Sequence, residues 1–395
     1  MGFAIDNEEI YSDINIKVVG VGGGGGNALN CMATEGIFDV EFVAVNTDAA
    51  ALRSSKASTK VQIGEKLTRG RGAGNKPEIG ERSAQENRDE IAAALKGATM
   101  VFIAAGMGGG TGTGAAPVVA EVAKEMDILT VAVVTKPFNF EQKAKMIQAE
   151  RGIGELMKHV DSLVVIPNER LISTNEKPLT MKESFSLADN ILKTGVKSIA
   201  ELITVDGFIN LDFADVETTM KNAGYAHMAI GHGSGKDKAA EAANAVITSP
   251  LLETSISGAT RLLVNIVMSE DALSTDIDTA TKLITEAADP DVELIFGASF
   301  DEICRMKSAL QLLLPVSETW KAQAQLSRPT KQNQKTAKVL KYLRLLQQLM
   351  IILSFLEFST AEINYIKSSR TLKCGFCFIY SKSVSEISDT DFLIQ

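Results

Sequence analysis

The stretch AAGMGGGTGTGAAP, at residues 104–117, decides the fold of this chain. It follows the apolar run TMVFIA (99–104), which is typical of a strand buried on both faces, and it leads into an amphipathic helix. Glycine has no Cβ, so such a loop can bring its backbone N–H groups close to a phosphate. The residues suited to phosphate binding are Gly108, Gly109, Gly110, Gly112 and Gly114, together with the hydroxyls of Thr111 and Thr113.

A second glycine run lies upstream in IKVVGVGGGGGNA (16–28), which also joins an apolar strand to a helix. Gly20, Gly22 and Gly25 match the G-x-G-x-x-G pattern of dinucleotide sites, a pattern of low specificity when it stands alone. Loops at the carboxyl ends of parallel strands face one crevice, so these two loops should converge on one polyphosphate. The sequence contains no P-loop motif (G-x-x-x-x-G-K-S/T). The candidate residues of this loop are Gly22, Gly23, Gly24, Gly25, Gly26 and Asn27.

Apolar runs and amphipathic stretches alternate around the two loops. The apolar runs predict strands at 14–21, 40–45, 99–104, 128–134 and 161–166. The amphipathic stretches predict helices at 27–36, 77–96, 115–126 and 141–159. This alternation is typical of a parallel sheet with helices on both faces, so we expect an α/β, Rossmann-like domain.

A second, smaller α+β domain is expected after a long helix at about 182–204. It begins with a loop at 206–215 and a helix to about Gly224. Strands are then predicted at 225–231, 259–268 and 291–297, alternating with helices at 237–247 and 276–288. At least one more partner strand is expected after Phe300.

The composition excludes several classes of protein. The 395 residues carry a net charge of −9, which argues against a general binder of nucleic acid or anionic membranes. No apolar run reaches the roughly 18 residues needed to span a bilayer, and the acidic N-terminus does not resemble a signal peptide. The three histidines are dispersed, so we predict no metal site built from them. A cytoplasmic protein without direct membrane insertion is expected.

Several segments together resemble the tubulin/FtsZ family of GTPases. They are VGVGGGGGNA, AVNTDAAAL (44–52), GGGTGTG, VVTKPFNFE (133–141), HVDSLVVIPN (159–168) and AELITVDGFINLDFADV (200–216), in the expected order. The resemblance covers about residues 10–302 and implies binding of GTP or GDP with Mg²⁺. It implies an N-terminal extension at 1–13, a GTP-binding domain at 14–180, a central helix at 181–205 and a second, polymerisation domain at 206–302.

The resemblance also assigns nucleotide contacts. Both glycine loops would hold the phosphates, with Thr111 facing the terminal one, and the turn Gly72-Ala73-Gly74 would close over it. Glu141 matches the acid that contacts the ribose, and Lys145 stands where the family usually has arginine, so the planar fork is lost.

Three residues of the long helix correspond to the guanine-binding positions. Phe185 falls where an aromatic ring stacks on the base, and the base-reading pair is Asp189-Asn190. An acid at the second position would accept from both guanine N–H donors, whereas the Asn190 carbonyl accepts one such bond. Either Asp189 compensates or the preference for guanine is weakened.

The acidic stretch NLDFADV contains Asn210, Asp212 and Asp215. From the residues alone, Asp215 is a plausible helix N-cap. The resemblance implies instead that this loop reaches the nucleotide site of the next copy, where Asp212 and Asp215 polarise the attacking water. Association would then be head-to-tail, and it would give an open filament if the rotation does not close. The resemblance further implies assembly at the mid-cell division site with division proteins that tether or regulate the ring.

The resemblance stops near Glu302. Residues 303–395 contain one glycine, Gly375, and carry 13 Lys+Arg against 6 Asp+Glu. Deleting one A from a GAAAAT run at the Glu302 codon turns the family segment NLQDEIRVTVIATGF into the ICRMKSALQLLLPV of residues 303–316. We therefore hypothesise a shifted reading frame, which would leave the second domain incomplete and expose a sheet edge. In such a tail, Cys374 and Cys377 are a coincidence, and the usual C-terminal binding peptide is not recognisable.

Two alternatives remain open from the sequence. The chain could bind the nucleotide without polymerising or turning it over, because its second domain is incomplete. It could also be a Rossmann-type oxidoreductase, as the pattern from Gly20 to Gly25 would allow, although the GGGTGTG loop argues against this class.

Overall fold

The structure is a computed structural model, and it describes residues 14–35, 40–173, 178–205, 207–252, 256–257, 259–269, 271–289, 291–300 and 307–316. The chain divides into two compact units, residues 1–324 and 325–395, and the second unit lies outside the described residues. The predictions for residues 1–13 and for Cys374 and Cys377 also lie outside them. Among the described helices, none combines the length and apolarity that crossing a membrane requires.

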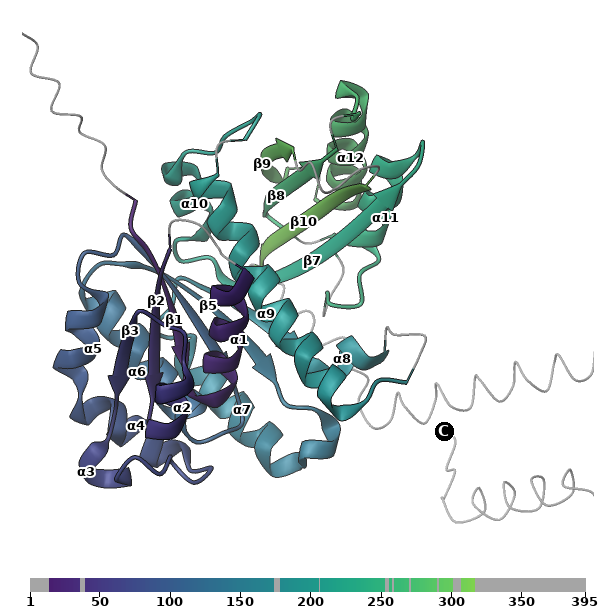
Figure 1. Cartoon of the computed structure of the whole chain (residues 1–395). Helices are drawn as coiled ribbons and strands as arrows, with labels where there is room; N and C mark the ends of the chain where they lie inside the picture. Colours follow the sequence, from purple (N-terminus) through teal and green to yellow (C-terminus); the bar gives the residue numbers. More distant parts are fainter. Residues whose placement is uncertain are drawn as a thin grey trace, which may run out of the picture. The chain divides into compact units, whose positions relative to one another are not determined.

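Six parallel strands form the first part of the sheet (Figure 1). Their order is β3-β2-β1-β4-β5-β6, with bounds β1 (Ile16–Val21), β2 (Val40–Asn46), β3 (Thr59–Gln62), β4 (Met100–Gly106), β5 (Leu129–Lys136) and β6 (Ser162–Pro167). The prediction of a parallel α/β sheet is confirmed. Only β3 was not predicted, because its four residues TKVQ carry no continuous apolar run.

Helices cover both faces of this sheet. Successive side chains of a strand point to opposite faces, and in β4 both faces are apolar: Phe102 lies in the core beneath one helical layer and Ile103 in the core beneath the other. The first layer contains α1 (Gly22–Glu35), α8 (Asn168–Ser173), α9 (Met181–Thr204) and α10 (Phe213–Met220). The second contains α4 (Pro77–Glu86), α5 (Arg88–Leu95), α6 (Thr111–Glu125) and α7 (Lys143–Leu156). The short helices are α2 (Ala49–Ser54), α3 (Glu65–Thr68) and the 3-10 turn η1 (Asn139–Glu141).

The helices differ from the sequence prediction in two places. α1 and α6 begin at Gly22 and Thr111, several residues earlier than expected, so glycines of both loops form their first turns. The single helix expected at 77–96 is interrupted at Asn87. The Asn87 amide oxygen accepts from Gly64 N at 2.8 Å, and its NH₂ donates to the Glu90 carboxylate at 2.8 Å, so the Asn87 side chain bonds to the loop before α3 and to α5 where α4 ends.

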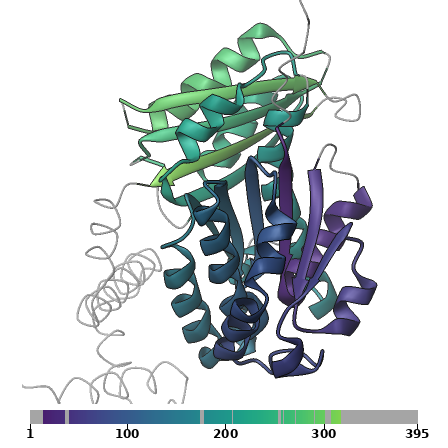
Figure 2. The same ribbon diagram turned by 90° about the vertical axis from the view of Figure 1, so that its left-hand side faces the viewer.

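The second part of the sheet continues from β6 (Figure 2). Its order is β7-β10-β8-β9, with bounds β7 (Gly224–Ser234), β8 (Arg261–Met268), β9 (Glu293–Phe300) and β10 (Lys307–Val316). α11 (Lys238–Ile247) and α12 (Ser274–Ala287) pack on it around a separate apolar core. The predicted α+β character of this domain is confirmed.

A strand does follow Phe300, as expected, but its position in the sheet contradicts the expectation of an exposed sheet edge. β10 runs antiparallel to β7 on one side and to β8 on the other. The sheet edge that we expected the altered segment to leave exposed is therefore paired in this structure. Described structure ends with this strand, at Val316.

The long central helix is confirmed as α9, with 24 residues and a length of about 36 Å. Thr180 and Glu183 form a capping box at its start: the Thr180 hydroxyl accepts from Glu183 N, and the Glu183 carboxylate accepts from Thr180 N. Buried residues such as Leu192 and Val196 join the core under α1. The helix thereby places its first residues near one end of the sheet and its last residues near the other.

Candidate functional site

The two glycine loops lie against each other. Gly22 has a φ of 72°, and a Cβ built on it would lie 2.7 Å from the backbone N of Gly112. A Cβ on Gly24 would lie 3.1 Å from the Cα of Gly106. Side chains at these positions would push the loops apart, so the predicted convergence of segments 22–27 and 108–114 is confirmed, and glycine is what permits it.

The glycines of these loops divide into two groups. Some allow backbones to pack: a Cβ on Gly25 would meet Ala104 O at 2.1 Å, and one on Gly114 would meet Pro77 O at 2.0 Å. Others face open space, since no atom lies within 4 Å of a Cβ built on Gly23, Gly26 or Gly109. The first N–H groups of a helix have no intrahelical partner, so the starts of α1 and α6 offer donors for an anion beside these open positions.

The two threonines of the second loop have different surroundings. The buried Thr113 hydroxyl accepts from Gly108 N at 2.8 Å, which closes the loop on itself. The Thr111 hydroxyl lies 2.7 Å from that of Thr47, a residue with no exposed surface. Sequence reasoning missed Thr47, although it lies two residues after the predicted strand 40–45 and directly after β2, where polar residues reach the same end of the sheet as the loops.

The turn at 69–75 borders the second glycine loop. A Cβ on Gly110 would lie 2.8 Å from the Cβ of Ala73, and Gly72 N donates to Thr47 O at 3.3 Å. Ala73 is buried, whereas nothing lies within 4 Å of a Cβ on Gly74. The turn therefore borders Gly110 of the second glycine loop, and its closure over a terminal phosphate stays a prediction.

Glu141 and Lys145 form an ion pair with each other, with 3.0 Å between Lys145 Nζ and Glu141 Oε2. The other Glu141 oxygen accepts from Phe138 N at 3.1 Å. A Cβ on Gly108 would lie 2.9 Å from Lys145 O, so this pair sits next to the second glycine loop. Their predicted contacts with a nucleotide stay a prediction.

Two aromatic rings contact Phe185, the buried ring of Phe138 and the exposed ring of Phe140. Phe185 is 43% exposed and meets the rings of Phe138 and Phe140 edge-on, with centroids 5.3 Å and 6.2 Å apart. Phe140, which is 48% exposed, was not predicted as a site residue. The signal was present, because the segment PFNF (137–140) places two phenylalanines close together. A flat apolar partner such as a base can stack on such rings.

Asp189 lies one turn beyond Phe185 on α9, so the two share a helix face. Burial raises the pKa of the Asp189 carboxyl to about 6, since desolvation disfavours its charged form. The side-chain oxygen of Asn190 accepts from Cys31 Sγ at 3.5 Å. The Asn190 oxygen is thus partly engaged within the chain, and the contacts of Asp189 and Asn190 with a guanine stay a prediction.

The acids Asp212 and Asp215 lie at the other end of the sheet. Ser162 Oγ, at the start of β6, donates to Met220 O at the end of α10, so this helix docks on the amino ends of the parallel strands, whereas the glycine loops follow the carboxyl ends. Both carboxylates are exposed and make no hydrogen bond within the described residues. The interpretation of Asp215 as a cap is wrong, because α10 begins at Phe213 with Asp212 as its N-cap.

The loop before these acids is anchored and carries exposed aromatic rings. Ile209 and Ala298 exchange two backbone hydrogen bonds of 3.0 Å, and the Asn210 side chain accepts from Gly207 N at 2.5 Å. Phe208 is 69% exposed and packs edge-on against Phe300, at a centroid distance of 5.7 Å. A fixed loop with exposed rings and unpaired acids is suited to contact another molecule.

No cluster of three or more His, Cys, Asp or Glu side chains that could hold a metal ion occurs among the described residues.

Two family models match the chain: the GTPase domain of the Tubulin/FtsZ family over residues 15–176, and the C-terminal domain of the FtsZ family over residues 224–314. The second match runs past Glu302, where the resemblance read from the sequence ended. The chain is similar to the solved structure of an empty FtsZ dimer from M. jannaschii, with 43% identity and a TM-score of 0.75, over 78% of this chain and 89% of that one. It is also similar to a GTPγS-bound protofilament of CetZ2 from Haloferax volcanii, with 23% identity and a TM-score of 0.65 over 82% and 99% of the two chains, an identity that shows the fold alone.

Proposed function

Because this chain belongs to the tubulin/FtsZ family, whose members are GTPases that bind GTP and GDP, we propose that it hydrolyses GTP only at the junction between two copies. The observation that carries the proposal is the separation of the two halves of the site. The glycine loops follow the carboxyl ends of the strands, and the free acids of α10 belong to the opposite end of the sheet.

In this proposal the first half of the site binds the nucleotide. The open positions at Gly23, Gly26 and Gly109 let backbone N–H groups reach the phosphates, and Thr111 donates to the terminal one. Phe185 stacks on the base and Asp189 accepts from its N–H groups. Mg²⁺, which prefers phosphate and hydroxyl oxygens, would be held mainly by the nucleotide with the Thr111 hydroxyl and would offset the developing charge.

The second half comes from the neighbouring copy. Its Asp212 and Asp215 carboxylates, which have no partner among the described residues, would orient a water in line with the terminal phosphate. Phe208 and Phe300 beside them supply apolar surface for the junction. Because one end binds the other, the contact is heterologous and repeats into a filament.

The finer biological role is also part of the proposal. We infer assembly into a ring at the bacterial division site, tethered by other division proteins, with membership in the family as its support. A fluorescent fusion should gather in a band at mid-cell, and an even distribution through the cell would contradict this role.

GTP turnover per chain, measured over a series of protein concentrations, tests the junction. We expect turnover per chain to rise with concentration until every site is completed by a neighbour. Asp212→Asn should bind GTP with unchanged affinity and lose at least about 10-fold in turnover, because water is no longer oriented.

Asp237→Asn is the matched control. Asp237 is also an exposed N-cap aspartate that makes no side-chain capping bond, but it belongs to α11. Its turnover should equal that of the unchanged chain. If turnover per chain is constant over the series of protein concentrations, the proposal that hydrolysis occurs between two copies is wrong. GTP binding without any turnover would support the non-polymerising alternative.

A further inference from the structure

The C-terminal end of α10 is held by side chains from two different strands. Arg261, the first residue of β8, donates to Thr218 O at 2.7 Å and to Thr219 O at 3.2 Å. Ser162, the first residue of β6, donates through its hydroxyl to Met220 O at 2.8 Å. These carbonyls belong to the last turn of the helix, where no intrahelical partner is available. The helix end is therefore fixed to both parts of the sheet.

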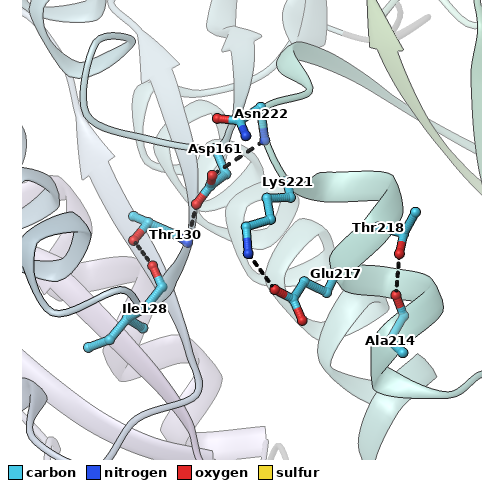
Figure 3. Close-up of polar contacts among 8 residues, drawn as sticks. All are labelled: Ile128, Thr130, Asp161, Ala214, Glu217, Thr218, Lys221 and Asn222. Carbon is cyan, nitrogen blue, oxygen red and sulfur yellow. Dashed lines mark hydrogen bonds and ion pairs between the residues drawn. The ribbon is translucent and has the colours of Figure 1, made fainter.

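Asp161 adds a carboxylate to this attachment (Figure 3). Its Oδ2 accepts from Thr130 N at 3.0 Å, at the start of β5, and its Oδ1 accepts from Asn222 N at 3.3 Å, just beyond α10. Its own backbone N donates to Thr130 O at 2.9 Å, and its carbonyl accepts from Gly224 N at 2.8 Å. One residue thus connects β5, β6 and the turn that leads from α10 into β7.

The turn that Asp161 holds has an uncommon backbone conformation. Asn222 has a φ of 53°, in the left-handed region, which asparagine adopts more readily than most other side chains. The hydrogen bonds from Asn222 N and Gly224 N to Asp161 stabilise the turn in that conformation. Loss of the carboxylate would remove the bond from Asn222 N, whereas the bond from Gly224 N goes to the Asp161 backbone carbonyl and would remain. The turn could then shift, and with it the helix end, within the limits set by Arg261 and Ser162.

The other end of α10 carries the two acids. The helix has eight residues and is about 12 Å long, and Val216 and Met220 beneath it are fully buried. A packed helix of this length moves as a rigid rod, so a displacement at its end changes where its first turn lies. A misplacement of about 1 Å is enough to slow a positioned reaction severely.

We propose that Asp161 is a positioning residue for GTP hydrolysis: by fixing the end of α10, it sets where Asp212 and Asp215 meet the nucleotide of the next copy. This inference rests on the proposed function, in which those acids act across the junction. Asp161 directly precedes β6, so it lies at the amino ends of the parallel strands, whereas the glycine loops of its own chain follow the carboxyl ends.

Asp161→Asn tests the inference with little change in volume. The amide offers one acceptor oxygen, so its NH₂ group must face the N–H of either Thr130 or Asn222. We expect turnover per chain to fall about 10-fold, while the dissociation constant for GTP and the thermal midpoint of nucleotide-bound protein change little. Glu217→Gln is the control, because the same chemical change there removes only the 2.8 Å ion pair to Lys221, the residue that follows α10 (Figure 3).

Mixing two variants separates positioning from a general loss of structure. Thr111→Ala keeps the acids and damages the phosphate loop, whereas Asp161→Asn keeps the phosphate loop. Where the nucleotide of an Asp161→Asn chain meets the acids of a Thr111→Ala chain, the site is complete. Turnover of the mixture should therefore exceed the sum of the two separate turnovers several-fold.

Each other outcome has one meaning. Weakened GTP binding by Asp161→Asn, turnover equal to that of Glu217→Gln, or a mixture that shows no gain would each overturn the positioning role. A gain in the mixture of Asp212→Asn with Thr111→Ala, measured in parallel, shows that the junction itself operates. If that second mixture also shows no gain, the proposed function has failed, not the role of Asp161 alone.

Discussion

At the scale of single residues, Thr47 lies beside the glycine loops, and only its contacts in the structure, not a sequence motif, indicate a role. Its buried hydroxyl lies 2.7 Å from that of Thr111, and its carbonyl accepts from Gly72 N and from the Thr68 hydroxyl. It therefore touches both the second glycine loop, through Thr111, and the turn at 69–75, through Gly72. A hydroxyl so placed decides which way the Thr111 proton points.

We predict that Thr47→Val weakens GTP binding about 5- to 30-fold, because valine keeps the volume but removes the hydroxyl that orients the Thr111 proton toward the terminal phosphate, a loss of about 1–2 kcal/mol. Thr47→Ser keeps the hydroxyl and should bind GTP almost as the unchanged chain does. Titration of each variant with a fluorescent GTP analogue measures this. Equal affinity for the valine and serine variants would refute the role of Thr47.

We predict that the affinity for GTP depends on pH through the Asp189 carboxyl. Burial raises the pKa of its carboxyl to about 6, so the group is mostly ionised at pH 7 and mostly protonated at pH 5. Only the ionised form accepts from both guanine N–H groups, so GTP affinity should fall as pH drops through about 6. Binding isotherms between pH 5 and 8 would measure this, and Asp189→Asn should show weaker binding with no such step. A step that survives in the asparagine variant would assign it to another group.

At the scale of elements, β10 shows that many different sequences can form a central strand. It pairs with β7 from Lys307↔Ser234 to Val316↔Tyr225, and with β8 from Ala309 to Leu313. These bonds are made by the backbone, so an altered segment with an extended apolar run can occupy the place. Pro315 lacks an N–H, and it falls outside the part that pairs with β8. The shifted reading frame after Glu302 remains our proposal, and the nucleotide sequence at that codon tests it.

A truncation measures what β10 contributes. A chain that ends at Phe300 would leave β7 and β8 with unpaired edges, so it should aggregate and yield little folded protein. A chain that ends at Ala324 retains the whole first unit and should unfold cooperatively. Thermal unfolding and the monomer fraction after gel filtration compare the two. Similar behaviour of both chains would show that β10 adds no stability.

At the scale of the whole molecule, one sheet separates the two halves of a site. The loops that suit phosphates follow β1 and β4, and the helix that carries the acids docks where β6 begins. α9 spans the distance between these ends and carries Phe185 near its start. In the proposed function, such a chain completes its active site only with a second copy of itself, so assembly and hydrolysis are expected to depend on each other.

Local features of the sequence were enough to predict the parallel sheet, the central helix and the meeting of the two glycine loops. Buried strands need apolar runs and tight loops need glycine, and both requirements are visible in any short window of residues. The sequence also pointed to Phe185, Asp189 and Asp212, although only through the resemblance to a family.

Only the tertiary structure decided which glycines pack and which face open space, that Thr47 meets Thr111, and that Asp161 holds α10. It also decided that residues 307–316 form a central strand. Each of these depends on the register of strands and the packing of segments far apart in the chain. Such contacts are set by the whole fold at once, so no local pattern of residues contains them.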